Sequence, residues 1–339
     1  MFRPAAETGT QCAVAEQPEI ARKERDRPVV VTGASGFVGT RLCRELLDGG
    51  WKVRALVRDP VKAAARLGHL PVELRAGDIR DADYLRGALE GAGAVVHLAA
   101  IAIERRGAGE TYERTNADAT QGVVDVAQAV GVERFVHMSQ NGADSRSPHR
   151  FLRSKGIAQD IVTGSGLRWT VLRPSVIVGP EDAFVNVLAR LVKLTPGVFL
   201  LPGGGTARFQ PIFVGDVVRA VRVALENDAT ISGMYAIGGP VPLTLRQMAE
   251  RILTAMRAWR VTVGVPVGVV RPLIAVAERV LPNPPVTTEL LDLLAVENTV
   301  PENAITSVFG IAPTPFAPEE LLYLRRITIG EALRSLVAH

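Results

Sequence analysis

The sequence predicts an α/β protein in which a doubly wound parallel sheet is followed by a smaller, irregular C-terminal lobe. Two observations predict this fold class. From residue 28 to about residue 178, short β-branched runs alternate with amphipathic helical stretches. After Pro180 the alternation loosens, and the later part of the chain is rich in proline. Regular alternation indicates parallel strands joined by right-handed helical crossovers, and its loss indicates a second lobe.

The strand candidates are short runs such as PVVVT and RWTVLRP, separated by helical stretches such as ATQGVVDVAQAVGV. Runs of this length and composition are typical of strands that are buried in a parallel sheet. The six expected strands are 28–32, 51–57, 71–76, 94–99, 134–139 and 168–174.

The chain divides into a tail, a sheet domain and a lobe. Residues 1–27 carry mixed charges and lack the uninterrupted apolar segment of a secretory signal, so we expect a flexible tail. The segment FQPIFVGDVV and the helix after it indicate a return to the sheet. The sheet domain is expected to comprise residues 28–180 and 208–233, and the C-terminal lobe residues 181–207 and 234–339.

Composition excludes several classes of function. The 339 residues are 47% hydrophobic and carry a formal net charge of +4. This apolar content allows a large core, and the dispersed basic charge argues against nucleic-acid binding. Cys12 and Cys43 lie far apart without histidine-rich spacing, which argues against a disulfide framework and against a metal site. A reducing, cytoplasmic setting is therefore expected.

The most apolar late stretch, residues 261–281, is interrupted by prolines and charged residues, so we do not expect it to span a membrane. Two interpretations remain open. The preferred one is a helix packed on its own domain. The other is a helix whose apolar side lies on a membrane surface or on a partner, which would place the protein at the periphery of the inner membrane.

The sharpest motif is VVVTGASGFVGTRL, residues 29–42, in which three glycines follow a strand and open a helix. Gly33 permits a tight turn, Gly36 lets backbone amides approach a pyrophosphate, and Gly39 lets the helix pack on the sheet. The pyrophosphate would then lie at the helix N-terminus. In this context of strand, turn and helix, the motif predicts dinucleotide binding.

The choice of dinucleotide is read at the end of the second strand, where an acidic residue would accept hydrogen bonds from the adenosine ribose. Here the strand runs into Arg58, and Asp59 follows. Because a guanidinium suits a 2′-phosphate, NADP(H) is predicted in preference to NAD(H). The alternative is that Arg58 is solvated and Asp59 holds the ribose.

Two further segments follow predicted strands. Asp78 is placed to bond the adenine amino group, with Ile79 against the ring. Ala99 and Ala100 are small enough for the backbone to pass close to a cofactor. Ligands of doubly wound sheets bind outside the carboxyl ends of the strands, so these residues reinforce the glycine motif.

Together these motifs resemble the short-chain dehydrogenase/reductase superfamily, specifically its extended and atypical, epimerase/dehydratase-like members. The matching segments include TGASGFVG, ALVRD, GDI, VVHLAA, HMSQNGA, FLRSK, VLRPSVIVGP and FQPIFVGDVV. The resemblance implies a Rossmann domain, a nicotinamide cofactor, and a C-terminal lobe over the nicotinamide pocket. The expected cofactor-binding residues are Gly33, Ser35, Gly36, Phe37, Val38, Gly39, Arg58, Asp78, Ile79, Ala99, Ala100, Lys155, Pro174 and Val176.

Within the superfamily, the sequence is similar to the nucleotide-binding accessory subunit of respiratory complex I and its bacterial relatives. The segments LRSK, LRPSVIVGPEDAFVN and FQPIFVGDVV carry this likeness, together with the tail LPNPPVTTELLDLLAVENTVPENAI. The likeness implies a protein partner of the complex I type, which the C-terminal lobe would contact.

The sequence departs from the catalytic pattern of the superfamily. Catalytic members use a serine or threonine after the fifth strand, a tyrosine as proton donor, and a lysine that lowers the pKa of the phenol. Phe151 stands at the tyrosine position. Gln140 stands nearest the hydroxyl position, with Ser139 one place early. Lys155 and Asn116 remain; we expect Lys155 to bond the nicotinamide ribose, and Asn116 to bond main chain or water.

Catalytic roles are therefore left unassigned among these residues and one further candidate, Tyr112. This tyrosine lies one helical turn before Asn116, where it would face the pocket region. A structural role for its ring is the preferred interpretation.

Three functions remain open. The first is an NADP(H)-binding protein whose tightly held cofactor stabilises the fold or a complex, with weak or no turnover. The second is an active NAD(P)-dependent oxidoreductase or sugar-nucleotide epimerase that takes its proton from a substrate group, water or Tyr112. The third is a nucleotide-responsive regulator, in which the occupied pocket changes a partner surface.

Overall fold

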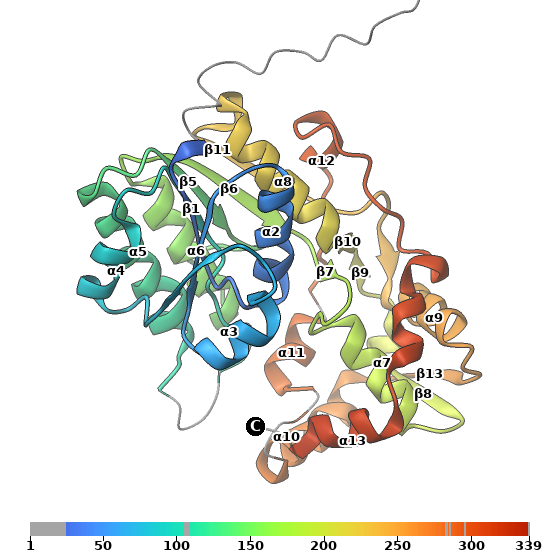
Figure 1. Ribbon diagram of the computed structural model, residues 1–339. Coiled ribbons are helices and arrows are strands. Elements are labelled where there is room, and N and C mark those ends of the chain that lie inside the picture. Colours follow the sequence, from blue (N-terminus) through green and yellow to red (C-terminus); the bar gives the residue numbers. More distant parts are fainter. Residues whose placement is uncertain (1–24, 105–108, 282–283, 285, 295, 338–339) are drawn as a thin grey trace, which may run out of the picture.

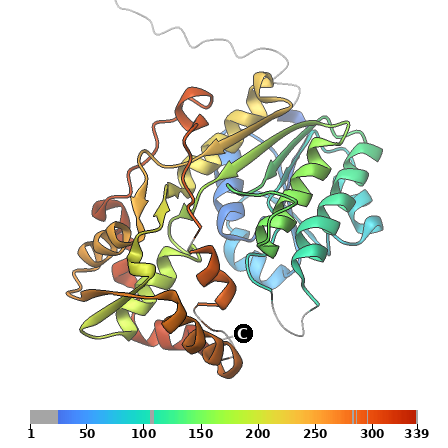
Figure 2. The ribbon, with the colours of Figure 1, turned by 180° about the vertical axis from the view of Figure 1, so that it is seen from behind.

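The computed structural model describes residues 25–104, 109–281, 284, 286–294 and 296–337. In these residues, helices cover both faces of a parallel sheet, and a smaller lobe lies beside it (Figures 1 and 2). The predicted fold class is confirmed. Residues 1–24 of the predicted tail lie outside the described residues, whereas Arg27 pairs with Glu133 on the sheet domain.

The main sheet consists of β1 Val29–Thr32, β2 Val53–Val57, β3 Glu73–Ala76, β4 Ala94–His97, β5 Arg134–Met138, β6 Arg168–Pro174 and β11 Gly233–Ile237. All neighbours are parallel, in the order β11-β6-β5-β4-β1-β2-β3. The chain winds outward in both directions from β1 and β4, and a doubly wound sheet binds ligands at such a switch point. Strands β1, β4 and β5 are buried throughout, which explains their aliphatic runs.

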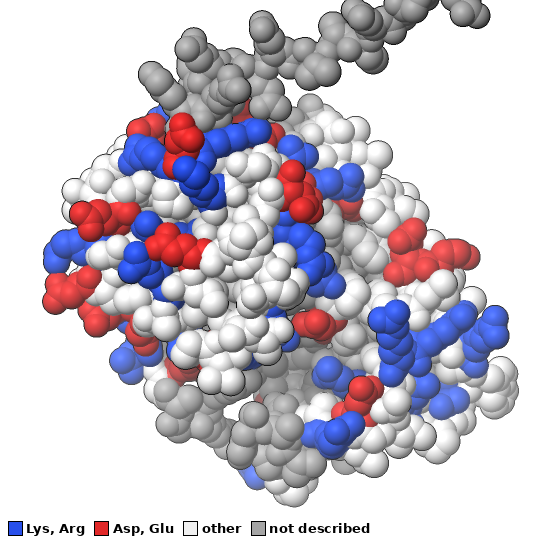
Figure 3. All heavy atoms as spheres, in the orientation of Figure 1, with Lys and Arg blue, Asp and Glu red and all other residues white. Residues whose placement is uncertain are grey.

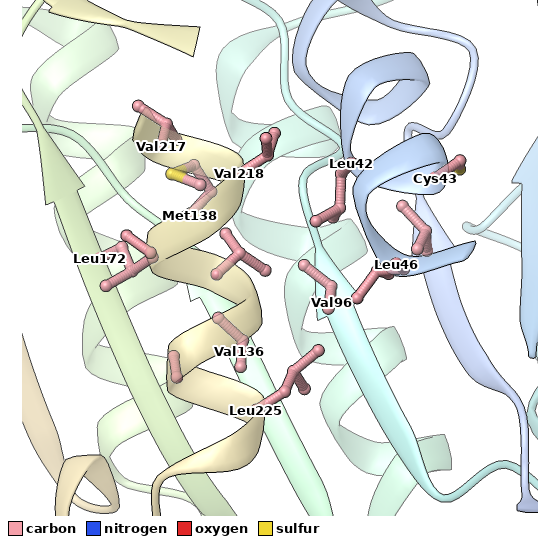
Figure 4. Close-up of a cluster of buried hydrophobic side chains, with 14 of the residues drawn as sticks. Leu42, Cys43, Leu46, Val96, Val136, Met138, Leu172, Val217, Val218 and Leu225 are labelled. Carbon is pink, nitrogen blue, oxygen red and sulfur yellow. The ribbon is translucent and has the colours of Figure 1, made fainter. Parts of the chain in front are cut away.

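The helices of this domain are α2 Phe37–Asp48, α3 Pro60–Leu67, α4 Ala82–Leu89, α5 Ala119–Ala129, α6 Arg150–Thr163 and α8 Val214–Glu226. On one face of the sheet, α2 contacts α8, and Leu42, Leu46 and Val217 fill the core between these helices and the strands (Figure 4). On the other face, α4, α5 and α6 cover a second core that contains Val95 and Phe135. Alternate strand residues face opposite cores, as the pleat requires.

The main elements of the C-terminal lobe are α7 Val185–Leu194, β8 Val198–Pro202, α9 Leu245–Met256, β13 Val261–Val265, α10 Val267–Val280, α11 Thr288–Leu293, a 3₁₀ helix at Pro318–Arg326 and α13 Ile329–Val337. β13 pairs with β8 in parallel. Phe199, Leu201 and Met248 belong to a core separate from those of the sheet. The start of α9 is fixed by a capping box between Thr244 and Gln247, which satisfies backbone donors at the helix end.

Two pairs of short strands lie between the sheet domain and the lobe. β7 Ile177–Val178 pairs with β10 Ile212–Phe213 in parallel, and β9 Arg208–Phe209 pairs with β12 Leu243–Thr244 in antiparallel fashion. Val178, Phe209 and Phe213 belong to the core of the lobe, whereas Ile212 belongs to the core under α2 and α8. These pairs therefore join the two cores.

Two segments after residue 233, which the sequence assigned to the C-terminal lobe, lie in the sheet domain. β11 pairs along β6 and completes the sheet, because the outer edge of β6 would otherwise leave backbone groups unpaired. Helix α12, Ala304–Ser307, contacts β11. Ile305 and Phe309 are buried in the core that α2 and α8 share.

Helix α10 contacts α11 but buries none of its own residues. The stretch therefore forms a helix that packs on α11 of its own lobe, as preferred, but its side chains at Val269, Leu273, Val276 and Val280 are exposed. Within the described ranges, no helix is long and apolar enough to cross a membrane.

Gly156 marks the place where α6 meets the segment that follows β5. A Cβ atom at this position would lie 2.2 Å from Asp144 C and from Ser145 N. Backbone atoms cannot yield as a flexible side chain can, so only glycine allows α6 to lie this close. Gly122 in α5 differs, since a Cβ there would meet no atom nearer than 3.9 Å.

We expect Gly156→Ala to lower the free energy of unfolding by about 1–3 kcal/mol, because the added methyl overpacks a backbone contact. The matched change Gly122→Ala should raise it by about 0.5–1 kcal/mol, because alanine is the better helix former. Urea unfolding of both variants measures the difference. Equal effects of the two substitutions would contradict the close approach at Gly156.

Candidate functional site

A cavity of about 710 Å³ opens at the carboxyl ends of the strands. The glycine turn, the segments after β2, β3, β4 and β5, and α6 form its wall. Val176, one of the expected cofactor residues, does not line it and instead packs against the core of the lobe. The expected residues that line the cavity are Gly33, Ser35, Gly36, Phe37, Val38, Gly39, Arg58, Asp78, Ile79, Ala99, Ala100, Lys155 and Pro174.

The glycine turn leaves no room for side chains. Gly33 has a φ of +66°, and a Cβ there would lie 3.0 Å from Ala99 N. At Gly39 a Cβ would lie 2.3 Å from Gly33 O, so the first turn of α2 reaches the strand only with glycine. This turn carries no capping side chain and no acidic residue. Its unpaired backbone N–H groups are therefore open to an anion such as a pyrophosphate.

Basic side chains line the cavity beyond the ends of β2 and β3. They are Arg58, Lys62 and Arg80. The Arg58 side chain is 53% exposed and pairs with Glu110. Arg80 donates hydrogen bonds of 2.9 and 3.0 Å to the two carboxylate oxygens of Asp78. This contact holds the pKa of Asp78 below its usual value, and Arg58 remains the more exposed guanidinium for a ligand.

Asp59 has a local structural role that the sequence alternative did not include. Its Oδ1 accepts a 3.0 Å hydrogen bond from the backbone N–H of Lys62 and caps α3. An N-cap of this kind satisfies one of the unpaired donors at a helix start. A ribose held by Asp59 would have to use the other carboxylate oxygen.

Thr32 and His97 hold the backbone that passes the glycine turn. Thr32 Oγ1 accepts hydrogen bonds of 3.2 Å from the N–H groups of both Leu98 and Ala99, and it lies 2.8 Å from His97 Nδ1. Burial lowers the pKa of His97 to about 3, so the ring is neutral near pH 7. The position of Ala99 against the turn thus depends on a buried neutral hydrogen-bond network.

Lys155 reaches the cavity from α6 and is 5% exposed. Its Nζ donates a 2.6 Å hydrogen bond to Met138 O, and no described acidic residue forms a salt bridge with it. Burial lowers its pKa to about 8, because desolvation disfavours the charged ammonium. An ammonium has three donors, so Lys155 has donors to spare for a ligand such as a ribose.

The other side chains beside Lys155 offer no efficient proton donor. Phe151 lies on the cavity wall one turn earlier in α6. Ser139 lines the cavity too, but its Oγ donates a 3.1 Å hydrogen bond to Gln159 Oε1. Gln140 also lies on the wall, and an amide hydrogen-bonds without titrating. The position of the expected phenol is thus taken by a hydrocarbon ring.

Two catalytic candidates, Asn116 and Tyr112, do not line the cavity. Asn116 lies in a π-helical turn, Glu113–Asp118. Its Oδ1 accepts a 2.8 Å hydrogen bond from Ile101 N, and its Nδ2 donates a 3.1 Å bond to Ile101 O. These are the main-chain contacts expected for this residue.

Tyr112 is 1% exposed and its ring lies 5.8 Å from that of Phe151, measured between centroids. Its hydroxyl donates a 2.8 Å hydrogen bond to Glu289 Oε2 of α11. Burial and this carboxylate raise the pKa of Tyr112, which makes the phenol a poor proton donor at neutral pH. The structural role preferred for this ring agrees with its contacts.

Sequence reasoning missed Lys62 and Arg80 on the cavity wall and Thr32 beneath it. Arg80 had a usable signal, since it follows GDI directly and so lies beyond a strand end. Lys62 had a weaker signal, because its position depends on how α3 starts. No sequence feature indicated the contact of Thr32 with Ala99.

These features define an α/β protein that binds a dinucleotide at the switch point of its sheet. The family described as NAD(P)H-binding matches residues 33–190, and the NAD-dependent epimerase/dehydratase family matches residues 152–238. The chain belongs to the NAD(P)-binding atypical short-chain dehydrogenase/reductases of the epimerase/dehydratase type.

Known relatives include both a respiratory subunit and an enzyme. The mitochondrial NADH dehydrogenase (ubiquinone) 1 alpha subcomplex subunit 9 of Arabidopsis thaliana is 30% identical over 292 residues, which cover 81% of this chain and 71% of that protein. A 3β-hydroxysteroid dehydrogenase/Δ5→4-isomerase of Mycobacterium tuberculosis is 30% identical and covers 67% of this chain and 69% of its own length.

A solved structure shares the fold. The dTDP-glucose 4,6-dehydratase of Streptomyces venezuelae, crystallised with NAD, aligns with a TM-score of 0.67 at 22% identity. The alignment covers 88% of this chain and 96% of that one. At this identity the likeness concerns the architecture alone.

The lowered pKa of Lys155 predicts a pH dependence of stability. Its folded value of about 8 lies below the unfolded value of 10.5, so the unfolded chain holds the proton more tightly. Lys155 therefore destabilises the fold below about pH 8, and this penalty is relieved as the pH rises towards 10.5.

We expect Lys155→Met to be more stable relative to the wild type at pH 7 than at pH 10, because methionine carries no charge to desolvate. Urea unfolding of nucleotide-free protein at the two pH values measures this difference. A stability difference that does not change with pH would contradict a buried, unpaired ammonium.

Proposed function

We propose that this protein binds NADP(H) as a structural or sensing cofactor, with little or no turnover. The observation that carries the proposal is a cavity lined by the glycine turn, Arg58 and Lys155, with Phe151, a side chain without a proton to give, on the same wall. Loss of a positioned general acid typically costs about 10² to 10⁴ in rate. A retained nucleotide still has a role, because binding only the folded state stabilises it by about 2.7 kcal/mol at 100 times Kd.

Lys155 supports the proposal as a binding residue. A buried ammonium without a carboxylate partner is costly, and the only hydrogen bond that its Nζ donates among the described residues goes to Met138 O. The hydroxyls of a nicotinamide ribose would accept hydrogen bonds from the remaining N–H donors of the Lys155 ammonium. Phe151 stands where catalytic members have tyrosine, whereas Lys155 is retained. This combination is expected if the site is selected for binding a nucleotide and not for transferring a proton.

Arg58 supports NADP(H) over NAD(H). It occupies the strand end at which NAD-binding sites place an acidic ribose partner, and its guanidinium is matched to a phosphate in geometry and charge. Glu110 pairs with Arg58, so a 2′-phosphate would either displace this carboxylate or share the Arg58 guanidinium with it. Arg80 and Lys62 stand on the same wall and would add to the positive field.

A complex-I-type assembly is the proposed setting, on the likeness to the NADH dehydrogenase (ubiquinone) subunit. Such a position would place the protein on the cytoplasmic side of the inner membrane, in contact with a protein partner. The hydrogen bond between Tyr112 and Glu289 joins a segment next to the cavity to α11 of the lobe. It supports a regulatory version of the proposal, in which the state of the nucleotide changes the affinity of the lobe for its partner.

An active reductase is the second candidate, and the pKa of Lys155 favours it. An ammonium with a pKa of about 8 is acidic enough to act as a proton donor near neutral pH. The 3β-hydroxysteroid dehydrogenase among the relatives suggests an apolar ketone as the trial substrate. If bound NADPH loses its absorbance when such a ketone is added, the proposal of little turnover fails. The epimerase alternative rests on the match to the epimerase/dehydratase family and on the fold likeness.

We expect Arg58→Ala to weaken NADPH binding about tenfold, since it removes one charge-assisted contact to the 2′-phosphate. NADH lacks this phosphate, so its affinity should change little. Titration calorimetry with both nucleotides measures the two affinities. The control is Arg86→Ala, because Arg86 pairs with Asp83 on the surface of α4, away from the residues of the cavity wall. Equal losses for NADPH and NADH would overturn the 2′-phosphate assignment.

A further inference from the structure

The outward face of α10 is apolar along its length. Val269, Leu273, Val276 and Val280 are 58%, 66%, 57% and 73% exposed. Their spacing of four, three and four residues aligns them along one side of the helix. Side chains of this size are normally buried against a core, and here none of them meets one among the described residues.

Two of the polar side chains of α10, Arg271 and Glu278, are directed to the protein. Arg271 pairs with Asp292 of α11. Glu278 accepts hydrogen bonds of 3.0 Å from both the backbone N–H and the hydroxyl of Thr288. These contacts fix the rotation of α10 on α11, so the apolar stripe faces outward and the carboxylate does not.

The neighbouring strands are apolar on their outer side as well. β13 leads into α10 through Pro266, and it pairs with β8 so that Val261 lies beside Val198 and Val263 beside Leu200. These four valine and leucine side chains are between 40% and 50% exposed. We refer to the stripe on α10 and this outer side of β8 and β13 together as the apolar face.

The apolar face and the segments that flank it in the chain, α7 and residues 257–260, carry an excess of positive charge. Residues 185–202 and 257–281 contain six basic side chains and a single acidic one, Glu278, which contacts α11. Figure 3 shows Lys and Arg gathered at the right of the lobe on the side that faces the reader, with Asp and Glu beside them. The six basic residues are Arg190, Lys193, Arg257, Arg260, Arg271 and Arg279.

We propose that the apolar face docks on an anionic lipid surface, with α10 lying in the plane of the interface. An exposed apolar stripe on a helix with basic residues and without outward carboxylates is the pattern of interfacial helices. Trp259, 77% exposed just before β13, is a residue type enriched at the level of lipid headgroups.

Two other occupants fit less well. A second copy of the chain would bring two sets of basic side chains together, and such like charges repel. A protein partner would need an acidic rim around an apolar centre, whereas an anionic bilayer supplies both at once. The inference goes beyond the nucleotide function and does not rest on it, because none of the residues of the apolar face lines the dinucleotide cavity.

The test is flotation of the full chain with lipid vesicles in a density gradient. We expect the protein to float with vesicles of phosphatidylcholine that contain phosphatidylglycerol, and to stay below vesicles of phosphatidylcholine alone. High salt should weaken the association, because it screens the charge term. Arg257→Gln combined with Arg279→Gln should weaken binding to the anionic vesicles in the same direction.

The decisive variant is Leu273→Asp combined with Val276→Asp, which we expect to reduce the vesicle-bound fraction at least about tenfold. Both side chains are exposed, so the fold should be kept, as unchanged NADPH binding would verify. The control is Val241→Asp, at an exposed valine between β11 and β12, which should float like the wild type.

Failure of the wild type to float, or equal flotation of the double variant, would overturn the proposal. So would sedimentation analysis in which the wild type dimerises without lipid and the double variant stays monomeric, since the apolar face would then join two copies of the chain. If the wild type binds vesicles but does not bind NADPH, the proposed nucleotide function fails and the lipid proposal stands.

Discussion

The contact between the glycine turn and the backbone around it is the constraint on which the rest of the site depends. With Gly39 against Gly33 O and Gly33 against Ala99 N, the first turn of α2, the end of β1 and the end of β4 meet without side chains between them. The open N–H groups of α2 are thereby held at the switch point of the sheet, where a pyrophosphate is bound best. Thr32 Oγ1 holds the segment after β4 at this position by accepting hydrogen bonds from the N–H groups of Leu98 and Ala99.

The two ends of the cavity, on either side of the glycine turn, differ in polarity. The end beside Arg58 and Arg80 is ionic, and both guanidinium groups are paired to carboxylates with which a phosphate would compete. The end beside Phe151 is nearly apolar, and the cationic group that the structure describes there, Lys155, is buried and donates a hydrogen bond to Met138 O. The chain thus keeps the groups that hold a dinucleotide, while Phe151, Ser139 and Tyr112 supply no free acidic hydroxyl.

Much of this arrangement was predictable because it is local in sequence. The strand at 168–174 was predicted with its observed bounds, and the strand predicted at 28–32 is found at Val29–Thr32, since β-branched runs with clear ends define such elements. The glycine motif and GDI indicated the cavity wall for the same reason. The cap that Asp59 forms on α3 was not predicted, because the same residue type serves both as a ribose ligand and as a helix cap.

The rest depended on contacts between distant parts of the chain. Tyr112 meets Glu289 across 177 positions, and β11 joins the sheet after a long excursion through the lobe. The periodicity of the sequence indicated that α10 has an apolar side. It did not indicate that this side is exposed, because exposure depends on how the helix packs on the rest of the chain. The outward direction of the stripe required the contacts of α10 with α11.

The proposed function requires that the folded chain retain its nucleotide instead of exchanging it in each catalytic cycle. Native mass spectrometry of protein purified without added nucleotide tests this most directly, with denaturation and identification of whatever is released. We expect one NADP(H) per chain that survives purification. An empty chain that takes up nucleotide only weakly would contradict it and would indicate an enzyme with an exchangeable cofactor.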